Sequence, residues 1–149
     1  MDQTKSGLIL CFHGCDETVR NGIVNKEMAM RKSENNYDWL GHGYYFWEDN
    51  EQRAFEFAHL QKLRGKIEKP AVLGAVVDLG YCLNLMDSRY LGMVKQAYFE
   101  YETDQQAIQE PLPKNRGGAD LLMRDLDCAV IEYLHINRTK AGLRSFDSV

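Results

Sequence analysis

Three short apolar runs, separated by segments with helical spacing, constrain the fold of this chain most strongly. Residues 7–14 and 71–80 are continuous apolar runs, and residues 43–48 are rich in aromatic side chains. Runs of this length that end at glycine or at polar residues are typical of buried strands. The segments between them differ in length, which disfavours a regular alternation of strand and helix. We therefore predict an α+β domain.

Residues typical of a helix N-terminus follow two of these runs, and a third helix start is predicted later in the chain. Asp16 is a predicted N-cap, and Asp49 with Gln52 has the spacing of a capping box for a helix that runs to about residue 63. Ser88 is the predicted cap of a third helix. The predicted apolar faces of the three helices are Val19 and Ile23; Ala54, Phe57 and Ala58; and Leu91, Val94, Tyr98 and Tyr101.

The C-terminal third of the sequence allows two interpretations. Residues 128–136 are apolar enough to form a strand after a shorter helix. However, apolar residues keep a helical period from Ala119 to Leu134, and this favours one helix over residues 118–137. Residues 104–118 are predicted to be a long loop, and residues 81–86 and 145–149 are predicted strands.

Composition suits one domain over residues 1–149, with 44% hydrophobic and 27% charged residues. The formal net charge of −4 argues against a nucleic-acid clamp that works by bulk charge. We expect no membrane span, because no apolar stretch reaches 18 residues, and no signal peptide. The four cysteines form no C-x-x-C pair, so we expect reduced thiols in a cytoplasmic protein.

Two histidine–glycine arrangements carry the chemistry that the sequence suggests. His13 and Gly14 end the first predicted strand, where an imidazole and a bare backbone can meet a ligand. An ordinary turn glycine after a hydrogen-bonded histidine explains the same pair. Gly41 and Gly43 bracket His42 and precede four aromatic residues, although the glycines alone are also typical of a bend or bulge.

Taken together, residues 12–14 (FHG) and 40–58 (LGHGYYFWEDNEQRAFEFA) resemble the ADP-ribosyltransferase superfamily, and in particular its poly(ADP-ribose) polymerase-like branch. The resemblance covers roughly residues 8–60. A looser similarity to uncharacterised bacterial proteins of this superfamily continues through DLDCAVI and SFDSV. The resemblance implies a mixed, mostly antiparallel split sheet flanked by helices. It also implies NAD as co-substrate and transfer of ADP-ribose to a protein or nucleic acid by a bacterial toxin or defence effector, with an inhibitory or antitoxin partner. The alternative is a module of the same fold that binds NAD or a partner without catalysis.

The resemblance also implies roles for individual residues. Tyr45 would stack on the nicotinamide ring, His13 would bind a ribose hydroxyl, and the backbone of Gly14 would bind the carboxamide. A second ring would come from Phe55 or Phe57, although neither stands at the family's offset. The implied NAD-binding residues are His13, Gly14, Gly43, Tyr44, Tyr45 and Phe57.

The superfamily's catalytic glutamate comes from a late strand, and Glu132 is the candidate in this sequence. On a strand Glu132 would hold the ribose hydroxyl, whereas on a helix it would be a surface or rim residue. Asp127 and Asp147 are weaker candidates. The resemblance implies further strands after residue 149, so we expect either a truncated chain or a shortened relative that binds NAD better than it turns NAD over.

The first predicted strand also carries two cysteines at alternate positions. Cys11, His13 and Cys15 would share one face of the strand, which suggests a thiol catalyst or a metal site. A fourth ligand at suitable spacing is not evident, so buried thiols are the favoured interpretation and no metal is predicted.

Overall fold

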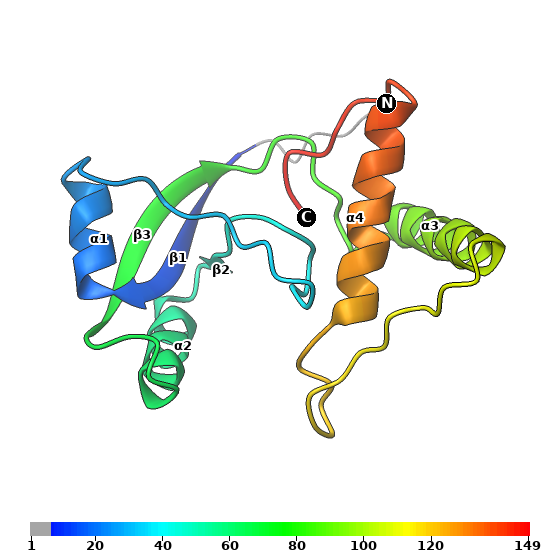
Figure 1. Ribbon diagram of the computed structural model, residues 1–149. Coiled ribbons are helices and arrows are strands. Elements are labelled where there is room, and N and C mark those ends of the chain that lie inside the picture. The colour runs from blue at the N-terminus through cyan, green and yellow to red at the C-terminus, as the bar shows by residue number, and fades with distance from the viewer. Residues whose placement is uncertain (1–6) are drawn as a thin grey trace. The chain divides into compact units, whose positions relative to one another are not determined.

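The computed structural model describes residues 7–149, which form three strands and four helices in the order shown in Figure 1. The elements are β1 (Leu8–Asp16), α1 (Glu17–Val24), β2 (Trp47–Glu48), α2 (Glu51–Leu63), β3 (Pro70–Asp78), α3 (Ser88–Ala107) and α4 (Asp125–Lys140). The described chain divides into two compact units: a sheet unit of residues 7–32 and 44–79, and a helix unit of residues 33–43 and 80–149. The predicted α+β class is confirmed, while the single domain over residues 1–149 stays a prediction. Residues 1–6, where the signal-peptide prediction falls in part, lie outside the description.

The sheet unit is built around β1, which lies between the other two strands in the order β2-β1-β3 (Figure 1). β1 and β3 are antiparallel and paired over nine residues, from Leu8 opposite Asp78 to Asp16 opposite Pro70. The predicted strands at residues 7–14 and 71–80 are therefore confirmed. Both strands are continuous apolar runs, yet only Cys11, Cys15, Ala71 and Leu73 among their apolar side chains are buried, whereas Leu8, Leu10 and Val76 are exposed.

The predicted aromatic strand at residues 43–48 is mostly wrong. Of this segment only β2 (residues 47–48) is a strand, and it pairs with β1 through Cys11 with Glu48 and Phe12 with Trp47. The preceding residues 44–46 have no regular secondary structure, because their neighbour is a side chain: the carbonyl of Tyr45 contacts the imidazole of His13. Within residues 7–149 the strands form one antiparallel sheet, and the split sheet that the resemblance implies stays a prediction.

Asp16 caps α1, as predicted, and also holds the chain before β3. Its Oδ1 accepts the backbone N–H of Thr18 at 3.0 Å, and its Oδ2 accepts those of Glu68 and Lys69 at 2.8 and 3.1 Å. These backbone hydrogen bonds hold the pKa of Asp16 well below its usual range.

The predicted cap of α2 is wrong by one residue. Asn50 is the cap, and its side chain accepts from the N–H of Arg53 at 3.0 Å. Asp49 instead adopts a positive φ of 47° in the turn after β2. Asparagine and aspartate are both good caps, so the pattern of residue types does not separate the two positions.

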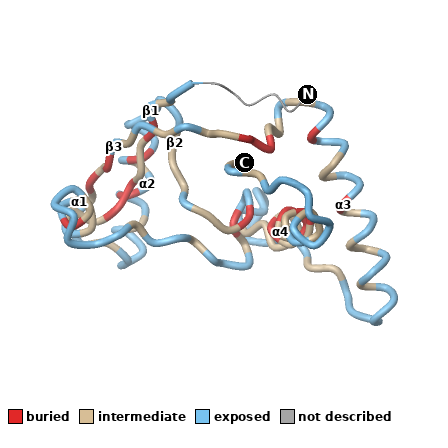
Figure 2. Tube along the Cα trace, turned by 90° about the horizontal axis from the view of Figure 1, so that it is seen from above, coloured by how far each residue is buried: buried red, intermediate tan, exposed pale blue. Residues whose placement is uncertain are grey.

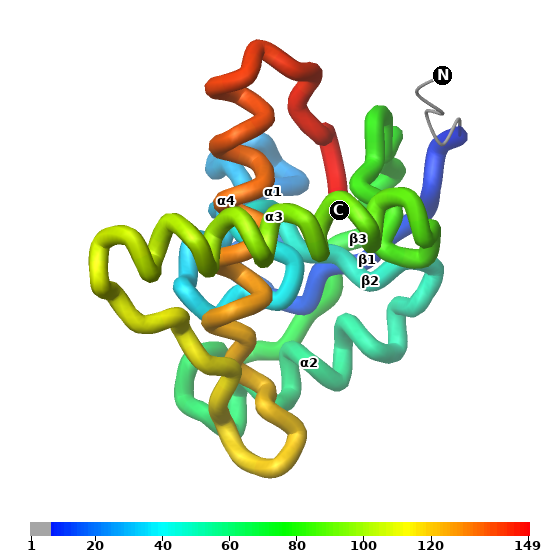
Figure 3. The backbone as a smooth tube through the Cα atoms, turned by 90° about the vertical axis from the view of Figure 1, so that its right-hand side faces the viewer, coloured from blue at the N-terminus to red at the C-terminus, as the bar shows by residue number. Residues whose placement is uncertain are grey.

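The helix unit is held together by the packing of α3 across α4, which cross in Figure 3. Buried stretches follow α4 in Figure 2. The buried centre of the helix unit consists of Leu83, Tyr90, Ala97, Val130 and Leu134. Three of the four predicted face residues of α3 pack against this centre, whereas Leu91 is 49% exposed.

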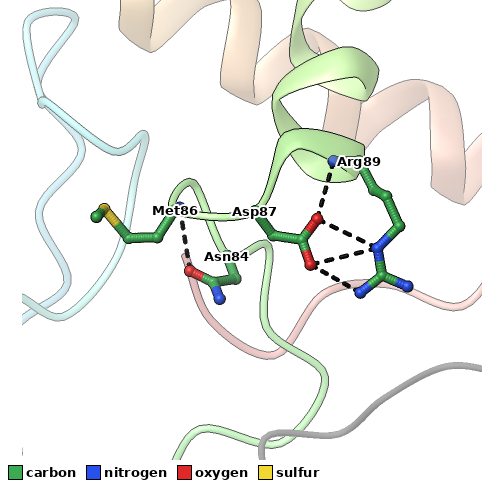
Figure 4. A network of polar contacts seen from close by, with 4 residues as sticks. All are labelled: Asn84, Met86, Asp87 and Arg89. Atoms are coloured by element: carbon green, nitrogen blue, oxygen red, sulfur yellow. Dashed lines mark hydrogen bonds and ion pairs between the residues drawn. The ribbon is translucent and has the colours of Figure 1, made fainter.

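The cap of α3 is Asp87 and not the predicted Ser88. Figure 4 shows the Asp87 carboxylate accepting from the backbone N–H of Arg89 at 2.9 Å and from its guanidinium at 2.7 Å. Hydrogen bonds from the Arg89 side chain lower the pKa of Asp87. The carboxylate of Asp87 and the side chain of Arg89 together stabilise the first turn of α3. In the turn before the helix, the side chain of Asn84 accepts the N–H of Met86 at 3.1 Å.

α4 confirms the helical interpretation of residues 128–136 but begins later than predicted. Arg116 and Met123 pair their backbones at 2.9 Å in both directions, which closes a turn at Gly117 and Gly118. Both glycines have positive φ, and such residues interrupt a helix. The helical spacing of apolar residues from Ala119 therefore wrongly predicts a helix before Asp125, where α4 begins.

The two weaker strand predictions in the helix unit are wrong. Residues 81–86 and 145–149 meet in a single bridge, Cys82 with Ser148, and not in a strand pair. Phe146 instead stacks on Tyr81, with ring centroids 4.5 Å apart, so side-chain packing holds this segment. The predicted loop at 104–118 is shorter than expected, because α3 continues to Ala107.

Candidate functional site

His13, near the end of β1, is oriented by the aromatic segment. Its Nδ1 lies 2.7 Å from the carbonyl oxygen of Tyr45. A carbonyl oxygen only accepts, so Nδ1 carries the proton, and in the neutral ring Nε2 is left as an acceptor. The ring also makes an edge contact with Phe46, at 5.9 Å between centroids. His13 therefore meets the Tyr45 segment through the backbone of Tyr45 and outside a strand. That the two side chains line one NAD site stays a prediction.

The backbone of Gly14 faces the side of β1 on which β2 lies. The carbonyl of Leu10 accepts from Asp49 on the β2 side, and the N–H of Glu17 donates to Lys69 on the β3 side. Because neighbouring residues of an antiparallel strand direct their N–H and C=O to opposite sides, Gly14 shares the side of Leu10. The ladder with β2 ends at Phe12. The amide and carbonyl of Gly14 therefore point toward the β2 side past the last residue of β2, and they form no ladder hydrogen bond with β3.

Gly14 is buried, because α2 packs directly on it. A Cβ at this position would overlap the carbonyl of Ala54 and come within 3.2 Å of the nitrogen of Ala58. Both alanines are fully buried. The small residues let the helix approach the strand. Among residues 7–149, Gly14 forms no backbone hydrogen bond outside the sheet ladders, and buried backbone groups of this kind normally have partners.

The remaining implied ring-binding residues of the sheet unit are more exposed. Tyr44 is 58% exposed and Phe57 is 39% exposed, whereas Tyr45 is half-buried. Phe57 lies on α2 beside Ala58, and Phe55 makes an edge contact with His59 at 4.5 Å. The stacking roles of Tyr44, Tyr45 and Phe57 stay predictions.

Glu132, the predicted catalytic acid, lies on α4 in the helix unit and binds the Gly-His-Gly segment of the same unit. Its Oε1 accepts the backbone N–H of His42 at 2.6 Å, and its Oε2 lies 3.6 Å from His42 Nδ1. Gly41 has φ of +80°, and a Cβ there would come within 2.7 Å of Glu132 Oε1. The carboxylate therefore fastens this turn to α4. Gly43, predicted to bind NAD, pairs its backbone with Ser33 at 2.8 and 3.0 Å.

A buried carboxylate that sequence reasoning missed organises the same segment. Asp38 is 8% exposed and accepts from the Ser33 hydroxyl at 2.9 Å and from the Asn35 N–H at 3.0 Å. The Sγ of Cys128 contacts the Asn35 carbonyl at 3.5 Å. The sequence signal was present in residues 33–38, where serine, asparagine and aspartate follow one another as in side-chain-bonded turns. This network shapes a loop and offers no open acid.

The four cysteines are buried and free, as the interpretation of buried thiols predicts. Burial raises the pKa of the Cys11, Cys15 and Cys128 thiols. A protonated thiol is a poor nucleophile, so the geometry disfavours a thiol catalyst at Cys11. In the described part of the chain, no group of three or more His, Cys, Asp or Glu residues is arranged to hold a metal ion.

Two surface hollows lie on the helix unit, beside α3. One, of about 350 Å³, is lined by Phe99, Asp104 and Tyr133 among others, and the second, of about 420 Å³, by the chain around Pro111 and Pro113. None of the predicted site residues lines either hollow. The candidate site at His13 and Gly14 therefore lies outside both hollows.

Comparison with known proteins adds no assignment. No protein-family model, no curated protein and no solved structure matches the chain. In residues 7–149 no helix is both long and apolar enough to cross a membrane.

Proposed function

We propose that this chain has an ADP-ribosyltransferase-like fold, binds NAD at the end of β1, and transfers ADP-ribose from it to a macromolecular acceptor. One observation carries the proposal: a buried glycine, Gly14, directs an amide donor and a carbonyl acceptor past the end of β2. A carboxamide has the complementary acceptor and donor in one plane. Nicotinamide can bind such an edge with two parallel hydrogen bonds, as an added strand would.

The neighbouring residues supply the other half of a nicotinamide riboside site. His13 presents Nε2 as an acceptor, because its Nδ1 donates to Tyr45. A ribose hydroxyl is a suitable donor to that nitrogen. The segment from Tyr44 to Trp47 supplies aromatic rings, and it meets His13 through the Tyr45 carbonyl and the Phe46 ring. A flat cationic pyridinium favours an aromatic surface.

The chemistry asks little of the protein beyond orientation. The bond between C1′ of the ribose and the pyridinium nitrogen breaks, and its electron pair leaves with neutral nicotinamide. A nucleophile of the acceptor then forms a bond to C1′ and loses its proton to solvent or to a base. The transition state is oxocarbenium-like, so positioning and negative charge near the ribose lower the barrier. The acid that the resemblance implies for this role is Glu132, and its part in turnover stays a prediction.

A second function, NAD binding without transfer, is favoured by the position of Glu132. Its carboxylate is already bound to the backbone of His42 in the helix unit, and it lies on a helix. A carboxylate committed to a loop is less able to hold a ribose hydroxyl. In this case the chain would recognise NAD, or a partner that carries a similar group, and release no nicotinamide.

Turnover of NAD distinguishes the two functions. The protein is incubated with NAD labelled in the adenine moiety and with a crude lysate, and both nicotinamide release and labelled macromolecules are measured. Transfer that is lost in Tyr45→Ala but retained in Phe99→Ala, an aromatic residue of α3 outside the candidate site, supports the transferase. Binding of NAD with no release supports the second function. Absence of binding refutes both.

A further inference from the structure

The outer edge of β3 is open along the part of the chain that the structure describes. β3 ends the strand order β2-β1-β3. Ala71, Leu73, Ala75 and Val77 lie opposite the odd-numbered residues of β1, whose backbone groups face β3. The alternation of an antiparallel pair therefore directs the N–H and C=O of Val72, Gly74 and Val76 outward.

The exposure of these residues agrees with an open edge. Gly74 is exposed, and Val76 is 64% exposed. Val76 lies opposite Leu10, and because paired residues share a face, both belong to one apolar patch with Leu8. Leu8 and Leu10 are 72% and 49% exposed. An apolar patch therefore adjoins three outward-facing peptide groups.

The sequence of β3 lacks the features that normally protect an edge strand. Between Pro70 and Asp78 the strand has no charged residue and no proline. Natural edge strands are usually interrupted by lysine, proline or a bulge, because an unprotected edge pairs with another chain. Asp78 stands only at the end, and the pairing with β1 is regular over all nine residues.

We propose that β3 pairs with β3 of a second copy of this chain, in antiparallel orientation about Gly74. An antiparallel edge is self-complementary under a two-fold axis, since each outward N–H then meets an outward C=O of the same segment. With Gly74 opposite Gly74, Val72 lies opposite Val76 and Asp78 opposite Pro70. The two Asp78 carboxylates are then roughly 26 Å apart, at eight residues of about 3.3 Å each, and do not repel.

Sedimentation velocity of the full chain over a range of concentrations tests this pairing. The wild type is expected to shift from monomer to dimer as concentration rises. Val76→Lys places a charge at the edge and is expected to weaken the dimer at least about tenfold. Leu63→Lys is the matched control, because Leu63 is 83% exposed at the end of α2, and it should dimerise as the wild type does. Circular dichroism confirms that each variant is folded.

A cross-link tests the register independently. Opposed residues of a hydrogen-bonded antiparallel pair have Cα atoms about 5.5 Å apart, within the range of a disulfide. A Cβ at Gly74 would make only an ordinary contact of 3.6 Å with Phe12. Gly74→Cys is therefore expected to give a disulfide-linked dimer under mild oxidation, and Leu63→Cys is not. A wild type that stays monomeric, a dimer that survives Val76→Lys, or equal cross-linking of the two cysteine variants overturns the proposal.

Discussion

Removal of the Glu132 carboxylate should release the Gly-His-Gly turn from α4. The 2.6 Å bond from the His42 N–H to Oε1 is charge-assisted, and hydrogen bonds to charged groups contribute about 1.5–3 kcal/mol. The Glu132 side chain is 26% exposed, so water can replace part of the lost hydrogen bond. We therefore expect the loss of Glu132 to cost the lower end of that range, about 1.5 kcal/mol. The contact between the two side chains, at 3.6 Å, is worth only about 0.2–1 kcal/mol.

The expected result is a change in the exchange of one amide. A loss of about 1.5 kcal/mol corresponds to roughly tenfold faster hydrogen exchange of the His42 amide in Glu132→Ala. Glu132→Gln keeps an acceptor oxygen and should exchange only about threefold faster, since a neutral hydrogen bond is about half as strong. His42→Ala keeps its backbone N–H and should change little after correction for intrinsic rates. NMR at pH 7 measures all three variants.

Two outcomes would refute this reasoning. Unchanged exchange in Glu132→Ala would mean that the turn does not depend on the carboxylate. A His42→Ala effect as large as that of Glu132→Ala would mean that the contact between the two side chains, and not the backbone bond, holds the turn. Because Glu132→Gln largely preserves the turn, it is also the variant with which to test the charge of Glu132 in NAD turnover.

Three further predictions follow from packing and protonation. Gly14→Ala should lower the free energy of unfolding by about 1–3 kcal/mol in denaturant titrations, because the new methyl group displaces α2 at Ala54; an unchanged midpoint would contradict the packing. Burial lowers the pKa of His135, so the unfolded chain binds more protons as pH falls below the ordinary value of 6.5. Stability should therefore fall from pH 7.5 to 5.5, and His135→Gln should flatten this slope; an equal slope would be the contrary result. The four buried thiols should react with a disulfide reagent slowly in the native protein and rapidly in denaturant, whereas fast native labelling of Cys11 would revive a thiol catalyst.

The sequence predicted the elements whose physical signals are local. β1 and β3 are continuous apolar runs of strand length, and Asp16 is a cap of standard chemistry. Helical periodicity correctly favoured a helix over a strand around Glu132. The prediction of the aromatic strand failed because strand formation depends on a partner: residues 44–46 meet the His13 side chain, so aromatic composition alone does not form a ladder there.

The remaining errors concern one turn and two helix caps. The turn at Gly117 and Gly118 overrides a helical period, and two capping assignments moved by one residue, since adjacent residues have equal capping ability. For the candidate site, the resemblance assigned His13 and Tyr45 to one NAD site, which stays a prediction. It did not anticipate that the contact uses the Tyr45 carbonyl, or that Glu132 binds the backbone of His42. Both depend on which atoms tertiary contacts bring together, and residue types do not specify this.

The carboxamide preference of the Gly14 edge tests the central claim most directly. The amide resonance of Gly14 is followed by ¹⁵N NMR while the protein is titrated with NAD, and separately with nicotinic acid adenine dinucleotide, in which a carboxylate replaces the carboxamide. The account predicts a saturable shift of the Gly14 resonance with NAD and at least about tenfold weaker binding of the acid, because its carboxylate cannot donate to the Gly14 carbonyl. Equal binding of the two dinucleotides, or a Gly14 resonance that NAD leaves unmoved, would contradict it.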